Sequence, residues 1–248
     1  MSIRHLIPSH WRYRLVATLL QKTLEPRVMA GPFKDMRYID TSAGSSLYPK
    51  LLGCYEKELH DAIDWICEQK PGLIVDVGAA EGYYAVGMAY RLPEVNVIAF
   101  EMEETARVHL SKLAKINQVE HRIGIHGRCT PEALELSLAS DLPSAMICDV
   151  EGYESTLLDP DRVPALRRAI VLVETHPHLA VGISDLLKRR FEATHELLTI
   201  ASQERNEFDF DATVVGGKWL PLKYKRSLVI ERGQSTPWIL MKPKVIAT

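Results

Sequence analysis

The sequence predicts an α/β fold in which helices cover both faces of a mostly parallel β-sheet. Short apolar runs rich in β-branched residues alternate with helical patterns from residue 73 to about residue 190, the order expected of a parallel sheet. Gly and Pro separate the segments, as Pro71 and Gly72 do before the first strand. The chain has 248 residues, of which 46% are hydrophobic and 25% charged, enough to bury one sizeable core.

Five strands make up the predicted parallel part, and two more follow it. The parallel strands are expected at residues 73–77, 96–101, 122–126, 145–150 and 169–175. The expected helices span residues 55–69, a segment ending near 91, residues 103–117, a segment that Thr130 caps with Pro131 in its first turn, and one beginning near 184. Strands at 196–202 and 238–242 are expected to close the sheet as an antiparallel pair, which makes seven strands.

The predicted organisation is an N-terminal helical and irregular extension, residues 1–53, followed by one domain, residues 54–248. Residues 9–24, with Ser9 as N-cap, have the pattern of an amphipathic helix. Docking on its own core is the commoner outcome for such a helix; a second subunit of a homo-oligomer and a membrane surface are the alternatives. The long polar segment 203–236 contains several aromatic residues, and two interpretations stay equally open: a substrate-covering insertion and a poorly ordered one.

Composition excludes several classes of function. The formal net charge of −2 gives no broad positive field, which argues against nucleic acid as a partner. The four cysteines follow no metal-ligand spacing and the chain is too long to need disulfides, so a reducing, cytoplasmic location is expected. The longest apolar run near the N-terminus, residues 15–20, is too short to span a membrane.

The first motif with chemical content follows the first predicted strand. Asp76, Gly78 and Gly82 form the pattern D-x-G-x-x-x-G at a strand-to-helix turn, with Ala79 and Glu81 inside it. Glycine is needed where backbone passes close to a ligand, and amides at a helix start can face one. The pattern is not the G-x-G-x-x-G of dinucleotide-binding proteins, so NAD is disfavoured. An S-adenosylmethionine (SAM) pocket has no diphosphate to cradle, and Asp76 and Glu81 suit the ammonium end of that cofactor.

The second motif is an acidic residue at the end of the second strand. Glu101 can accept hydrogen bonds from both hydroxyls of a ribose, and Met102 beside it can pack on the adenine face. Gly127, after the third strand, is a weaker candidate for the adenine edge. Because the ends of neighbouring strands line one crevice, Glu101 and Gly78 are expected to share a ligand.

The third motif lies at the ends of the fourth and fifth strands. Asp149 and Glu151 follow a buried strand, and His176 follows the next one shortly after Glu174. Carboxylates at such a position are costly without partners, which implies a ligand, a metal or a catalytic base. The alternatives are a helix N-cap for Asp149, an ordinary exposed acid for Glu151 and a structural histidine for His176.

These motifs together resemble the FkbM-type methyltransferases. The resemblance rests on Asp149-x-Glu151-Gly152-x-Glu154 followed by Leu157-Leu158, on Val75-Asp76-x-Gly78-Ala79, on Glu174 and on the lead-in at residues 52–59, and it covers about residues 53–174. It implies a Rossmann-like class I methyltransferase fold, SAM as cofactor, which Asp149 would also contact, and O-methylation of a sugar or another small-molecule or glycan hydroxyl. Asp149, Glu151 and His176 would then be the catalytic residues, with Asp149 the first candidate for base or orienting group and His176 the second.

Two alternatives to this function stay open. Residues 149–156 also resemble, more loosely, the macrocin-type sugar O-methyltransferases, which would imply a magnesium ion held by acids after strands four and five. That pattern needs adjacent acids after strand five, where Glu174 and His176 stand instead, so the metal is undecided. A module that binds SAM or a nucleotide without catalysis is the other alternative, and the acids after strand four argue against it.

Overall fold

The computed structural model describes residues 11, 18, 26–210, 220–231 and 236–244. The helix predicted at 9–24 lies almost entirely outside these residues. The chain divides into two compact units, residues 1–57 with 203–233 and residues 58–202 with 234–248. The domains expected from the sequence, residues 1–53 and 54–248 with 203–236 as an insertion, stay a prediction.

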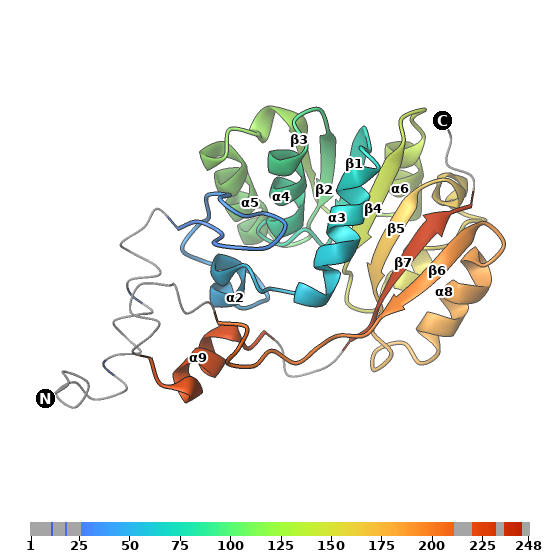
Figure 1. The fold of residues 1–248 in the computed structure, drawn as a ribbon. Coiled ribbons are helices and arrows are strands. Elements are labelled where there is room, and N and C mark those ends of the chain that lie inside the picture. The colour runs from blue at the N-terminus through green and yellow to red at the C-terminus, as the bar shows by residue number, and fades with distance from the viewer. Residues whose placement is uncertain (1–10, 12–17, 19–25, 211–219, 232–235, 245–248) are drawn as a thin grey trace, which may run out of the picture. The chain divides into compact units, whose positions relative to one another are not determined.

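The larger unit is built on a seven-stranded sheet with the order β3-β2-β1-β4-β5-β7-β6 (Figure 1). The strands are β1 (Leu73–Val77), β2 (Asn96–Phe100), β3 (Ile123–His126), β4 (Ser144–Cys148), β5 (Ile170–Glu174), β6 (His195–Ile200) and β7 (Trp238–Pro243). The strands β1 to β5 pair in parallel, and β7 lies antiparallel between β5 and β6. This is the Rossmann-like architecture that the sequence predicts, including the antiparallel C-terminal pair.

Helices cover both faces of the sheet (Figure 1). In the larger unit they are α3 (His60–Glu68), α4 (Tyr83–Arg91), α5 (Glu104–Ile116), α6 (Pro131–Leu138), α7 (Glu154–Leu157) and α8 (Ile183–Phe191), with 3-10 turns η2 (Lys57–Leu59), η3 (Glu120–Arg122) and η4 (Pro164–Arg167). Apolar residues of α6, α7 and α8 form one buried cluster with Val75, Val77 and Val171 of the sheet. The helix α4 packs against β1 and β2, and α5 against β3.

The burial of the central strands explains their sequence. Every residue of β1, β4 and β5 is buried, because helices cover both of their faces, and such strands read as continuous apolar runs. The predicted cap of α6 is also present: Thr130 Oγ1 accepts a hydrogen bond of 3.2 Å from the amide of Ala133. The helix predicted at 55–69 is shorter, because η2 occupies its first turn.

The smaller unit contains α2 (Leu47–Leu52) and α9 (Leu222–Val229), neither of which the sequence predicted. Gly53 ends α2 at φ 73°, and an added Cβ there would lie 2.1 Å from the carbonyl oxygen of Ala30. Only Leu228 and Val229 of α9 are buried, so its apolar pattern is too sparse to recognise within a polar segment.

None of the helices among the described residues is both long enough and apolar enough to cross a lipid bilayer.

Candidate functional site

The candidate site lies at the carboxyl ends of the parallel strands. From β1 the chain adds β2 and β3 on one side of the sheet, and then returns to add β4 on the other side of β1, so the strand order reverses there. Open α/β sheets bind ligands in the crevice that such a reversal creates. Asp76, Glu101, Asp149 and His176 all come from strand ends at this edge or from the residues that follow them directly.

The turn after β1 is tightly bonded within the protein. The amides of Gly78 and Ala79 both donate to the carbonyl of Phe100, at 2.9 and 3.0 Å, and the amide of Gly82 donates to Ala79 at 2.8 Å. The amide of Ala80 donates to Glu101 Oε2 at 2.8 Å. The amides of Gly78, Ala79 and Ala80 thus hold the turn against the end of β2 and the residue after it. A ligand at this turn stays a prediction. Glu81, inside the turn, is fully buried.

The two glycines of the turn are required by close packing. An added Cβ at Gly78, where φ is 82°, would lie 1.8 Å from the carbonyl oxygen of Asp149. At Gly82, where φ is 96°, it would lie 2.8 Å from Cγ of Leu110. The close approach in this structure is to Asp149 after β4 and to Leu110 of α5, and the approach to a ligand that the glycines suggested stays a prediction.

Asp76 is a buried carboxyl group at the end of β1, with 3% of its surface exposed. Its pKa is raised to about 7, chiefly by burial; a hydrogen bond with the backbone of Ala85 lowers the pKa, and the neighbouring carboxylates of Asp149 and Glu101 raise it. Its Oδ2 has no hydrogen-bond partner among the described residues. A ligand that donates a proton or carries positive charge would satisfy this oxygen.

Glu101 connects the turn after β1 with the segment after β2. Its Oε2 accepts from Ala80 and its Oε1 accepts from the amide of Glu103 at 2.8 Å. A carboxylate has about four lone-pair sites, so two backbone bonds leave capacity for ribose hydroxyls. Met102 beside it is 66% exposed, and an added Cβ at Gly127 would meet nothing within 4 Å. Both residues follow paired strands, because β2 and β3 are neighbours.

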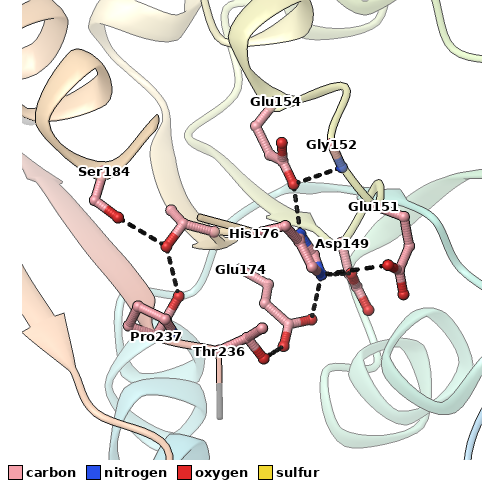
Figure 2. Close-up of polar contacts among 10 residues, drawn as sticks. Asp149, Glu151, Gly152, Glu154, Glu174, His176, Ser184, Thr236 and Pro237 are labelled. Atoms are coloured by element: carbon pink, nitrogen blue, oxygen red, sulfur yellow. Dashed lines mark hydrogen bonds and ion pairs between the residues drawn. The ribbon is translucent and has the colours of Figure 1, made fainter. Parts of the chain in front are cut away.

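A cluster of four carboxylates surrounds His176 after β4 and β5 (Figure 2). The Nδ1 atom of His176 is hydrogen-bonded to Glu154 Oε1 at 2.5 Å, and Gly152 donates its amide to the same oxygen at 3.0 Å. The Nε2 atom lies 3.5 Å from Asp149 Oδ1, 3.7 Å from Glu151 Oε2 and 3.7 Å from Glu174 Oε2. The structure therefore brings together the three predicted catalytic residues, Asp149, Glu151 and His176.

The charges of this cluster shift the pKa values of its members. Burial acts most strongly on His176 and lowers its pKa, but the hydrogen bond with Glu154 and the charges of Asp149, Glu154 and Glu151 outweigh burial, so the pKa is raised. Burial likewise raises the pKa of Glu154, and the hydrogen bonds from His176 and Gly152 outweigh it, so that pKa is lowered. Both shifts favour an ionised Glu154 held against the ring.

Two carboxylates of the cluster, Glu154 and Glu174, and the neighbouring Thr236 were not among the predicted site residues. Glu154 and Glu174 are 0% and 1% exposed, and Thr236 donates its hydroxyl proton to Glu174 Oε1. Glu154 is the last acid of the D-x-E-G-x-E motif and could have been found from it. Thr236 could not, because only the antiparallel pairing of β7 with β5 brings the residues before Trp238 beside the end of β5.

The backbone after β4 adopts a conformation that turns Glu151 outward. Glu151 has φ 48° and Gly152 has φ 100°, so two successive residues are left-handed. The side chain of Glu151 is 72% exposed, whereas that of Asp149 is 29% exposed. Glu151 thus lies at the solvent side of the cluster and Asp149 deeper within it.

No protein-family model matches the sequence, and no curated protein does. Solved structures do match. The O-methyltransferase TomG of Streptomyces achromogenes, in complex with SAM, has 11% identity over 96% of this chain and 92% of its own, with a TM-score of 0.48. A protein of Clostridium thermocellum provisionally described as an rRNA methylase has 10% identity over 77% of this chain and 97% of its own, with a TM-score of 0.49.

A third match is TYW2 of P. horikoshii in complex with MeSAdo, with 12% identity and a TM-score of 0.42. It covers 70% of this chain, and the chain spans 58% of its length. Likenesses of this strength identify neither a family nor a substrate. The strand order and the antiparallel pair of the sheet itself establish the fold class.

Proposed function

We propose that this protein is a SAM-dependent methyltransferase that methylates a hydroxyl group of a small molecule or glycan. The observation that carries the proposal is the pair of acidic positions at one sheet edge. Glu101 is fixed to the turn after β1 by a 2.8 Å bond, and Asp149 follows the strand on the other side of β1. A cofactor that spans these two strand ends would present its reacting group beside the cluster around His176.

The cofactor residues have distinct expected roles. Glu101 would accept hydrogen bonds from the ribose hydroxyls, and the exposed Met102 and Gly127 would lie against the adenine. Asp76 Oδ2, which has no hydrogen-bond partner among the described residues, would accept a hydrogen bond from the ammonium end of SAM. Asp149 follows β4, the strand paired with the one that carries Asp76. The amides of Gly78, Ala79, Ala80 and Gly82 all donate within the protein, so these four do not cradle a diphosphate, which disfavours NAD.

When bound, SAM supplies an activated methyl group, so the protein mainly aligns the acceptor and keeps the pocket dry. The acceptor hydroxyl must also lose its proton. With Nδ1 of His176 donating to Glu154, Nε2 is the basic atom, and it faces Asp149. Either Nε2 or Asp149 Oδ1 can receive the proton.

Calorimetric titration with S-adenosylhomocysteine tests the cofactor part of the proposal. We expect one molecule to bind per chain, and Glu101→Gln to weaken binding by roughly tenfold or more, because a charge-assisted hydrogen bond is worth about 1.5–3 kcal/mol. Glu94→Gln, an exposed acid between α4 and β2, serves as the matched control and should bind like the parent chain. Absence of heat with folded protein, or binding of NADH in its place, would contradict the proposal.

The methyl-transfer part is tested with Asp149→Asn. We expect this variant to bind S-adenosylhomocysteine within a few-fold of the parent and to lose most turnover, since general-base catalysis contributes about 10²–10⁴-fold. The assay supplies SAM with panels of sugar and aromatic hydroxyl acceptors and measures methylated product by mass. Unchanged turnover in the variant would favour a module that binds the cofactor without using the cluster for chemistry.

A further inference from the structure

We propose that Asp149, Glu151 and His176, with Glu174 beside them, form a binding site for a divalent transition-metal ion such as Zn²⁺ or Mn²⁺. One ligand atom from each of the first three residues lies within 4.8 Å of the others. The site rests on the proposed function and deepens it, because it is formed by the residues expected to handle the acceptor. Metal binding can nevertheless be measured without methyl transfer.

The distances around Nε2 fit ligands that share an ion. The three carboxylate oxygens lie 3.5, 3.7 and 3.7 Å from it, and none of them makes a hydrogen bond with it. In a four-coordinate site with bonds of about 2.0–2.2 Å, tetrahedral geometry separates neighbouring ligand atoms by roughly 3.3–3.6 Å. The observed separations are therefore too long for hydrogen bonds and close to those of ligands around one metal ion.

His176 is a buried polar side chain aimed at the centre of the carboxylates (Figure 2). Its side chain is 2% exposed, and Nε2 makes no hydrogen bond in the part of the chain that the structure describes. A buried ring nitrogen normally has a hydrogen-bond partner. Since the ring is held by Glu154 through Nδ1 at 2.5 Å, Nε2 cannot turn toward another group.

The second nitrogen of the ring has the partner typical of a metal-binding histidine. A ligating histidine almost always donates its other N–H to a carboxylate or carbonyl, which fixes the tautomer and leaves the first nitrogen basic. Glu154, fully buried and also bonded to the amide of Gly152, provides this carboxylate. Thr236 likewise holds Oε1 of Glu174, while Oε2 of Glu174 is the oxygen nearest Nε2.

Charge and ligand type indicate the class of ion. Asp149, Glu151 and Glu174 bring three carboxylates to one imidazole nitrogen, and an ion of charge +2 would offset their mutual repulsion. A nitrogen among oxygen ligands suits Zn²⁺, Mn²⁺ or Fe²⁺ better than Mg²⁺ or Ca²⁺, which prefer oxygen alone. Because Glu151 is 72% exposed, the site is open to solvent on its side, as sites that also take a substrate oxygen are. A bound ion would promote loss of the acceptor's proton by binding its oxygen, and the proton would then pass to water, because Nε2 of His176 and Oδ1 of Asp149 would serve as ligands instead of as the base.

Calorimetric titration of the chelator-treated full chain with Zn²⁺, Mn²⁺, Mg²⁺ and Ca²⁺ tests the site. We expect one Zn²⁺ or Mn²⁺ to bind per chain, and Mg²⁺ and Ca²⁺ to bind at least roughly tenfold more weakly than either ion. Co²⁺ provides a second readout, because its visible absorption reports nitrogen and oxygen ligands. The proposal is overturned if no ion binds stoichiometrically or if Mg²⁺ or Ca²⁺ binds as tightly as Zn²⁺.

Variants distinguish this site from adventitious surface binding. Glu151→Gln changes an exposed side chain and should leave folding intact while weakening Zn²⁺ binding by roughly tenfold or more, since loss of even an outer-sphere partner costs about 10–100-fold. Asp149→Asn should behave alike, and Glu94→Gln should bind Zn²⁺ like the parent. His176→Gln should abolish the Co²⁺ spectrum, with circular dichroism verifying its fold. Zn²⁺ affinity unchanged in both Glu151→Gln and Asp149→Asn would refute the site.

The outcome is separable from that of the proposed function. S-adenosylhomocysteine binding is measured on the metal-free chain, where we expect it to persist, because Glu101 and Asp76 lie outside the metal ligands. Loss of cofactor binding with intact Zn²⁺ binding would refute the methyltransferase alone. Cofactor binding without Zn²⁺ binding would refute the metal site alone.

Discussion

At the scale of single residues, Asp76 makes stability depend on pH. Its pKa is raised from 3.8 to about 7 in the folded chain, mainly by burial. The protonated form is therefore favoured by folding. Its contribution to stability is complete below a pH of about 4 and is lost as the pH rises through about 7.

Asp76→Asn removes this dependence. The unfolding free energy of the variant minus that of the parent should increase by roughly 2–3 kcal/mol from pH 5 to pH 8. The increase amounts to about 1.4 kcal/mol per pH unit up to the pKa of Asp76, at about 7, and levels off above it. Urea unfolding at the two pH values measures it. Asp141→Asn, at an exposed acid before β4, should show no such growth. An equal gain at both pH values would mean that Asp76 does not carry the dependence.

At the scale of elements, the turn after β1 joins the sheet to both halves of the site. Gly78 lies against the carbonyl of Asp149, and its amide is bonded to Phe100, so one residue contacts the ends of β4 and β2. The close packing is by itself a reason why the turn needs glycine. A change in the turn would move Asp149 as well as the bond between Ala80 and Glu101.

Gly78→Ala tests this packing against a control with similar backbone strain. Gly182 has φ 77° and nothing within 4 Å of an added Cβ, so Gly182→Ala should cost only the left-handed strain, about 1–2 kcal/mol. At Gly78, overpacking against Asp149 should add about 1–3 kcal/mol. Equal losses of unfolding free energy in the two variants would show that the backbone near Asp149 shifts to accommodate the added methyl group of Gly78→Ala at no cost in free energy.

At the scale of the whole molecule, stability should fall from the centre of the sheet to its edges. The strands β1, β4 and β5 are buried throughout and paired on both sides, whereas β3 and β6 are edge strands with exposed residues. Native-state hydrogen exchange should therefore find amides of β1 and β4 protected at least roughly tenfold more than those of β6, a difference of about 1.4 kcal/mol. Comparable protection in β6 would contradict this gradient.

The positions of strands and most helices in the larger unit could be predicted because their patterns are local. The four apolar residues of β1 and the cap at Thr130 are visible without knowledge of the fold. Other elements carry weak local patterns: α9 buries two of its residues, and α2 is a six-residue helix in an irregular segment. The predicted substrate cover at 203–236 stays a prediction.

The sequence by itself determined the alternation of strands and helices, the glycine turn after Asp76 and the acids at the strand ends, since each depends on neighbours along the chain. Only the tertiary structure decided which atoms these residues meet. It directed the turn amides to Phe100 and Glu101, surrounded Nε2 of His176 with three carboxylates, and brought Thr236 to Glu174 from 62 residues away. The physical reason is that strand pairing sets these contacts, and pairing joins segments that share no local pattern.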